Sequence, residues 1–89
     1  MTLNNFFKMV TSSDYNLVKI EKNNKRSLYN ISSIIKRDDD NLYVYGAQPG
    51  VSPIFAFIFN NVFNYTVNSK EDIEISYEGT PQYYLIKKV

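Results

Sequence analysis

The densest group of side chains that could bind a ligand is a run of four oxygen-bearing residues: Asp38, Asp39, Asp40 and Asn41. Oxygen ligands of this kind suit divalent cations. Counted from Asp38, an EF-hand would need glycine at the sixth position and glutamate at the twelfth, where this chain has Tyr43 and Pro49. We therefore interpret the row as a solvated turn or as an acidic tip for a partner, and we expect no bound metal.

The chain contains no histidine and no cysteine, and this composition excludes most catalytic arrangements. Nucleophile triads need a histidine base, histidine is the usual acid–base group near neutral pH, and zinc sites depend on histidine or cysteine ligands. We therefore expect no enzymatic activity and no cofactor. The lack of cysteine, of a signal-peptide pattern and of a long apolar run favours a cytoplasmic protein that does not cross a membrane.

Basic residues are concentrated in the first part of the chain, although the formal net charge is only +1. Residues 1–37 hold seven Lys or Arg against two acidic residues, whereas residues 38–78 hold one Lys against seven acidic residues. A phosphate-binding strip on the predicted hairpin would use six cations: Lys19, Lys22, Lys25, Arg26, Lys36 and Arg37. The alternative is a solvated hairpin whose charges discourage pairing between molecules.

Aromatic residues are the second group of candidate contact residues, at 16% of the chain. Several tyrosines, among them Tyr43 and Tyr45, fall in predicted strands, and strand alternation prevents all of them from pointing into one core. Tyrosines on an open sheet face suit protein interfaces, or they only cover the sheet by cross-strand packing. Phe57 falls on the asparagine-rich side of a predicted helix, where it either packs under another element or anchors a partner.

An apolar stretch over residues 51–64 organises the predicted fold. Ser52 and Pro53 are typical of the start of a helix. Six apolar residues then recur with the spacing of one helical face: Ile54, Phe55, Ile58, Phe59, Val62 and Phe63. The pattern predicts an amphipathic helix that packs on a sheet. A first helix is predicted over residues 2–10, with a strand over residues 6–10 as the alternative.

Five strands are predicted around these helices, over residues 15–22, 26–37, 42–45, 72–78 and 82–88. Asn23 and Asn24 indicate a tight turn because Asn tolerates the left-handed conformation. The adjacent Ile34 and Ile35 indicate a bulge or a strand that is buried on both faces. These hairpins predict one α+β domain over residues 1–89, in which a mainly antiparallel sheet carries helices on one face in the order α-β-β-β-α-β-β.

Residues 14–45 resemble part of a family of small phage-encoded anti-CRISPR proteins that inhibit type II-A Cas9. The shared pattern consists of Asp14-Tyr15 opening the first strand, Ile34-Ile35 late in the second, and Asp40-Asn41 with Tyr43-Val44 around the next turn. The resemblance implies contact with the site where Cas9 binds its PAM, in the manner of DNA, by Asp14, Asp40, Asn41 and Tyr43.

These features predict a non-enzymatic protein-binding module of phage or mobile-element origin. Its partner would be a host protein or nucleoprotein complex, such as a CRISPR nuclease that the module inhibits. The candidate contact residues are Asp14, Asp38, Asp39, Asp40, Asn41, Tyr43, Tyr45 and Phe57. The alternatives are a single-stranded nucleic-acid-binding sheet that uses the basic hairpin, and a homo-oligomer in which the opposite charge zones pair between copies.

Overall fold

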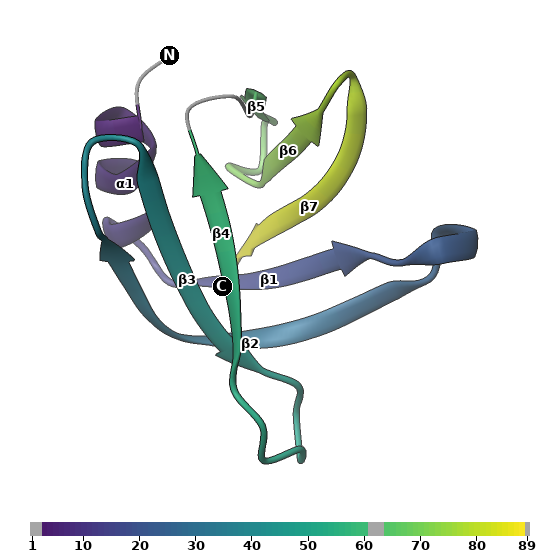
Figure 1. Ribbon diagram of the computed structural model, residues 1–89. Helices are drawn as coiled ribbons and strands as arrows, with labels where there is room; N and C mark the ends of the chain where they lie inside the picture. Colours follow the sequence, from purple (N-terminus) through teal and green to yellow (C-terminus); the bar gives the residue numbers. More distant parts are fainter. Residues whose placement is uncertain (1–2, 61–63, 89) are drawn as a thin grey trace.

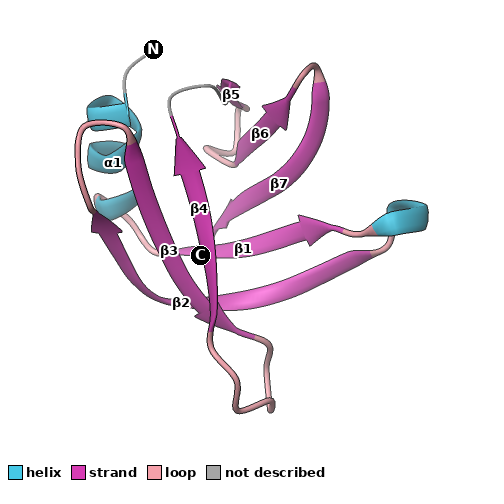
Figure 2. Ribbon diagram, in the orientation of Figure 1, coloured by secondary structure: helices cyan, strands magenta, loops and turns pink. Residues whose placement is uncertain are grey.

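One antiparallel sheet and one short helix make up the computed structural model, which describes residues 3–60 and 64–88. The elements in chain order are α1 (Leu3–Thr11), β1 (Tyr15–Ile20), the 3₁₀ turn η1 (Lys22–Asn24), β2 (Arg26–Lys36), β3 (Asn41–Ala47), β4 (Phe55–Asn60), β5 (Asn64–Val67), β6 (Ile73–Tyr77) and β7 (Thr80–Lys87). The seven strands lie in the order β4-β3-β2-β1-β7-β6-β5. The sheet curls into a half-barrel, which leaves β4 and β5 at its two edges (Figure 1 and Figure 2).

The prediction of a central helix over residues 51–64 is wrong. Residues 51–54 are irregular, Phe55–Asn60 is strand β4, and Asn64 begins strand β5; Val62 and Phe63 lie outside the described residues. Three phenylalanines stand at every second position of β4, where Phe57 and Phe59 are buried and Phe55 lies at the rim of the core, and aromatic residues are enriched in strands. The predicted α+β domain of about five strands with helices on one face is therefore replaced by a seven-stranded half-barrel with one helix.

Other local predictions agree with the structure. Helix α1 forms where a helix was favoured over a strand. Asn23 and Asn24 both adopt positive φ, at 66° and 61°, in the turn between β1 and β2. The bulge of β2 lies slightly earlier than its two adjacent isoleucines, because the pairing register with β3 shifts between Ile31 and Ser33. This shift turns Ile34 toward the core and leaves Ile35 exposed on the opposite face.

The core fills the concave side of the sheet, where α1 covers it with the buried side chains of Leu3, Phe6 and Val10. Phe6 meets Phe59 of β4 edge to face, with ring centroids 6.0 Å apart. Phe59 in turn meets Tyr83 of β7 at 5.2 Å. Since β4 and β7 are not neighbours in the sheet, these contacts show that the sheet bends far enough for its own inner face to close on itself.

Gly46 in β3 permits a close approach of two strands next to the bulge. A Cβ atom at this position would lie 2.8 Å from the backbone oxygen of Asn30 in β2. Backbone atoms cannot yield as the end of a flexible side chain would, so any larger residue here would displace a strand. The glycine is therefore a structural residue of strand β3.

Truncation of the inner face should cost far more stability than truncation of the rim. Phe59 is fully buried, so we expect Phe59→Ala to lower the free energy of unfolding by about 3–5 kcal/mol, measured by urea denaturation. Phe55→Ala is the matched control in the same strand, because its side chain is 43% exposed and leaves a smaller cavity. Equal losses for the two variants would contradict the inward orientation of Phe59.

Candidate functional site

The convex face of the sheet carries an aromatic and basic cluster that we call the Tyr43 patch, which consists of Ile35, Arg37, Tyr43, Tyr45 and Ile58. Strand pairing places Ile35, Tyr43 and Ile58 in one row across β2, β3 and β4. The alternate residues of β3 are buried, so its two tyrosines point away from the core. Ile35 and Ile58 are 41% and 51% exposed, which is unusual for isoleucine.

Arg37 holds the two tyrosines of the patch in one arrangement. Their rings lie 6.3 Å apart and are tilted by 38°. The guanidinium carbon of Arg37 stands 5.2 Å from the centre of the Tyr43 ring, and its Nη2 donates to the Tyr45 hydroxyl at 3.4 Å. That hydrogen bond raises the pKa of Arg37, and a guanidinium is always charged in proteins. The patch thus combines a fixed cation, two rings and two aliphatic side chains.

The acidic turn between β2 and β3 adjoins the patch, and Asp38 organises it. The Asp38 carboxylate accepts from the backbone N–H of Asp40 at 2.8 Å and from the backbone N–H of Asn41 at 2.9 Å. These bonds, that to Asp40 first, lower the pKa of Asp38. Asp39 points into solvent and pairs with Lys36 at 3.6 Å. One carboxylate therefore builds the turn, and the described residues contain no cluster of three or more metal-ligating groups.

Two predicted contact residues lie away from this surface. Phe57 is 7% exposed, and its ring packs against Tyr29 at 4.8 Å and against Tyr83 at 5.8 Å. It is therefore a core residue rather than a partner anchor, in agreement with the packing alternative. Asp14 lies between α1 and β1, where its carbonyl oxygen accepts from the Lys88 N–H at 2.9 Å. The structure thus gathers residues 38–41 with the two tyrosines, and leaves Asp14 apart.

The six hairpin cations do not form one strip. Lys19, Lys22, Lys25 and Arg26 surround the turn between β1 and β2, but Lys36 and Arg37 lie at the far end of β2. The ten residue steps from Arg26 to Lys36 span roughly 33 Å at about 3.3 Å per residue. Lys36 also donates to the side chain of Asn4. Lys19 and Arg26 have opposite parity in the β1–β2 register and point to opposite faces, so Lys22, Lys25 and Arg26 are the cations that can act together.

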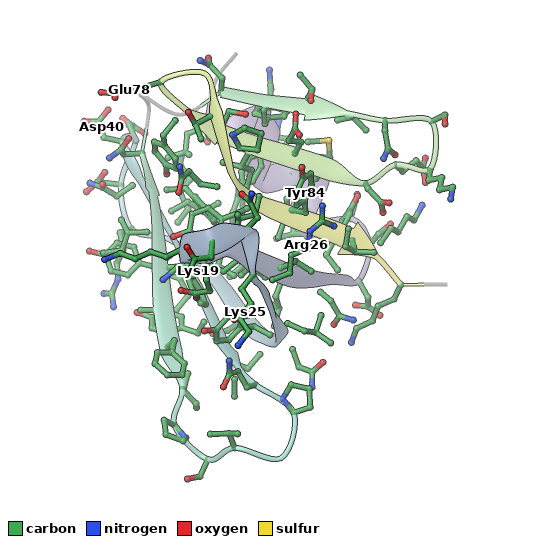
Figure 3. The ribbon with its side chains drawn as sticks, turned by 90° about the vertical axis from the view of Figure 1, so that its right-hand side faces the viewer. Lys19, Lys25, Arg26, Asp40, Glu78 and Tyr84 are labelled. Atoms are coloured by element: carbon green, nitrogen blue, oxygen red, sulfur yellow. The ribbon has the colours of Figure 1, made fainter. Side chains whose placement is uncertain are left out.

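Arg26 has an aromatic neighbour that the sequence did not indicate as a site residue. The Arg26 guanidinium lies 5.2 Å from the centre of the Tyr84 ring, and the Tyr84 hydroxyl donates to Glu74 at 3.0 Å, which raises the tyrosine pKa. Figure 3 looks onto this hairpin and shows Arg26 beside Tyr84. Lys19 pairs with Tyr83, whose ring packs on Phe59 in the core, so Lys19 lies on the opposite face of the sheet from the pair. Arg26 and Tyr84 come together because Tyr84 of β7 pairs with Val18 of β1, and no local sequence motif indicates this register.

The acid sensitivity of the turn can be measured through Asp38. Because its pKa is lower in the folded chain, the carboxylate stabilises the fold above the ordinary value of 3.8 and loses this effect as the pH falls through the folded pKa. We expect the free energy of unfolding of Asp38→Asn, measured by urea denaturation, to decrease less steeply than that of the wild type as the pH falls below 3.8. Glu78→Gln, in the turn between β6 and β7, is the control and should keep the wild-type slope.

Comparisons with protein-family models, curated proteins and solved structures find no match to this chain. The likeness of residues 14–45 to Cas9 inhibitors therefore stays a sequence-based prediction. Within residues 3–60 and 64–88, no helix has the length and apolar character needed to cross a membrane. The case for function depends on the surfaces described above.

Proposed function

We propose that this chain is a non-enzymatic protein-binding module that contacts its partner through the Tyr43 patch. The observation that carries the proposal is the ordered Arg37–Tyr43–Tyr45 cluster on an exposed sheet face, with an exposed isoleucine on either side of Tyr43. Tyrosine and arginine are the residues that most often dominate binding energy at protein interfaces. Because the guanidinium already orders both rings, binding them costs little additional conformational entropy.

The charge around the patch suits a partner with a basic rim. Asp38, Asp39 and Asp40 stand in the turn that precedes β3, next to the patch, where Asp38 builds the turn and Asp39 pairs with Lys36 at 3.6 Å. Acidic side chains at the rim of an interface speed encounter with a basic surface and set its orientation. A DNA-binding surface of a host nuclease has this character, which supports the class of partner that residues 14–45 suggest.

Capture of partners with matched variants tests this proposal. We expect the wild-type protein to retain a specific protein from host lysate, and Tyr43→Ala/Tyr45→Ala to bind the purified partner at least about tenfold more weakly. Tyr84→Ala is the control, since it removes a tyrosine of β7 that lies beside the β1–β2 hairpin and outside the Tyr43 patch. Absence of any captured protein, or equal affinity of the patch variant and the wild type, would contradict the proposal.

A second candidate function is single-stranded nucleic-acid binding at the β1–β2 hairpin. The observation in its favour is the stacking of Arg26 on Tyr84 beside a cleft that both residues line with Asn24 and Pro81. Lys22 and Lys25 add positive charge in the turn next to this cleft, whereas Lys19 lies on the opposite face of the sheet and pairs with Glu21 at 3.7 Å. A cationic surface with an aromatic ring suits phosphates and unstacked bases.

Fluorescence anisotropy of a labelled oligonucleotide tests the second candidate. We expect the affinity to fall steeply with salt, at about 0.7 logarithmic units per phosphate neutralised and per tenfold change in salt, and Arg26→Gln to reduce both affinity and slope. Lys70→Gln, in the turn after β5, removes a lysine elsewhere and should change neither. Lack of binding at about 50 mM salt would eliminate this function.

A further inference from the structure

Strand β4 differs from the rest of the sheet in exposing apolar side chains along an open edge. It ends the strand order, and within the described residues no strand pairs with its outer side. Four of the eight large apolar side chains that are exposed in the described chain fall within residues 51–58, and these are Val51, Ile54, Phe55 and Ile58. Backbone donors and acceptors along the outer side of such a strand can pair with another strand.

None of the usual devices that protect an edge strand is present in β4. Its six residues contain no lysine, no other charge and no proline, since Pro53 precedes the strand. Its pairing with β3 runs through six consecutive partners without a bulge. The charge-free segment extends far beyond the strand, because residues 41–69 contain no Asp, Glu, Lys or Arg. An edge of this length and composition is suited to strand addition.

We propose that β4 pairs antiparallel with β4 of a second copy of this chain and joins the two half-barrels into one continuous sheet. The charge distribution selects a second copy. A two-fold axis runs the edge against itself in reverse, so the residues near the axis lie close to their own equivalents and a charge there would face a like charge. The edge with the longest charge-free surroundings is therefore the edge that can pair with itself.

The acidic turn is compatible with this arrangement. Asn41, which follows the turn, pairs with Asn60 at the end of β4, so each turn lies beside the C-terminal end of the strand. Antiparallel pairing places that end next to the start of the other β4, where residues 48–54 are uncharged. The two acidic turns then lie at opposite ends of the junction and do not repel each other at close range.

The other edge of the sheet is a poorer partner for β4. Strand β5 has four residues against six in β4. The turn that follows β5 carries Lys70 and Glu71, and Asn68 organises it by accepting from the backbone N–H groups of Lys70 and Asp72. A β4–β5 contact would also be head-to-tail and would continue into a ring or a filament. The β4–β4 contact closes with two chains, and antiparallel pairing about that axis leaves both Tyr43 patches on the same side of the joined sheet.

The mass of the protein in solution tests this proposal. We expect sedimentation equilibrium between about 1 and 100 μM to show a rise from the mass of one chain to the mass of two. We place the two-fold axis at Ile58, near the middle of β4, so Ile58→Lys should weaken the association at least tenfold because the two lysines then face each other. Its side chain is half exposed on the convex face, so the variant retains the core. Ile86→Lys is the control, since it adds the same charge on the convex face of β7, away from the edge, and should leave the mass unchanged.

A mixing experiment separates edge pairing from a general effect of added charge. Ile58→Glu alone should also remain a single chain, whereas an equal mixture of Ile58→Lys and Ile58→Glu should restore the mass of two chains, because opposite charges then meet at the axis. A single-chain mass for the wild type over the whole range, an assembly larger than two chains, or a mixture that stays single-chain would each overturn the proposal. Ile58 also belongs to the Tyr43 patch, so the masses are measured on the purified protein without a partner. Tyr43→Ala/Tyr45→Ala, which alters the patch but not β4, should keep the mass of two chains, and this separates the two proposals.

Discussion

Burial of the inner aromatic row of β4 is the constraint on which the rest of the structure depends. A single sheet with one nine-residue helix has no second layer large enough to cover it. The sheet must therefore curl until its own inner residues meet, and the contact of Phe59 with Tyr83 is where this closure occurs. Helix α1 fills the remaining space, since Phe6 touches both Phe59 and Tyr65. Apolar area removed from water by this closure is the main source of stability.

The same curvature determines what the outer face can do. Residues that alternate with the core positions of β2, β3 and β4 are turned outward together, and the bulge after Ile31 sets which isoleucine of β2 joins them. Ile35 therefore lies beside Tyr43 on the convex face, while Ile34 packs inward. Gly46 makes the strong bend possible, because its missing side chain lets β3 approach the backbone of Asn30. The Tyr43 patch is thus a consequence of how the core closes.

Much of this chain was predictable from local patterns, and the failure concerns one segment. The alternation of Ile73, Ile75 and Tyr77 predicted β6, and the paired asparagines predicted the turn at residues 23–24. Residues 54–59 satisfy helical spacing and strand alternation alike, because phenylalanine occupies every second position and isoleucine adds the helical contacts. The misfit of Phe57 on the supposed helix was the available signal, since alternation places it inward beside Phe59. Pairs such as Arg26 with Tyr84 depend on register between distant strands, which composition and spacing do not encode.

The open edge at β4 follows from the geometry of closure. Phe57 and Phe59 bring the inner face of β4 against β7 through their side chains, while β4 remains the last strand of the described sheet. A lysine directed inward would disrupt the aromatic core, but the outward positions of Ala56 and Ile58 are exposed and could hold one without loss of packing. Packing therefore does not account for the apolar residues on the outward side of β4. Association along that edge does account for them, because it would bury apolar side chains and complete the ladder at once.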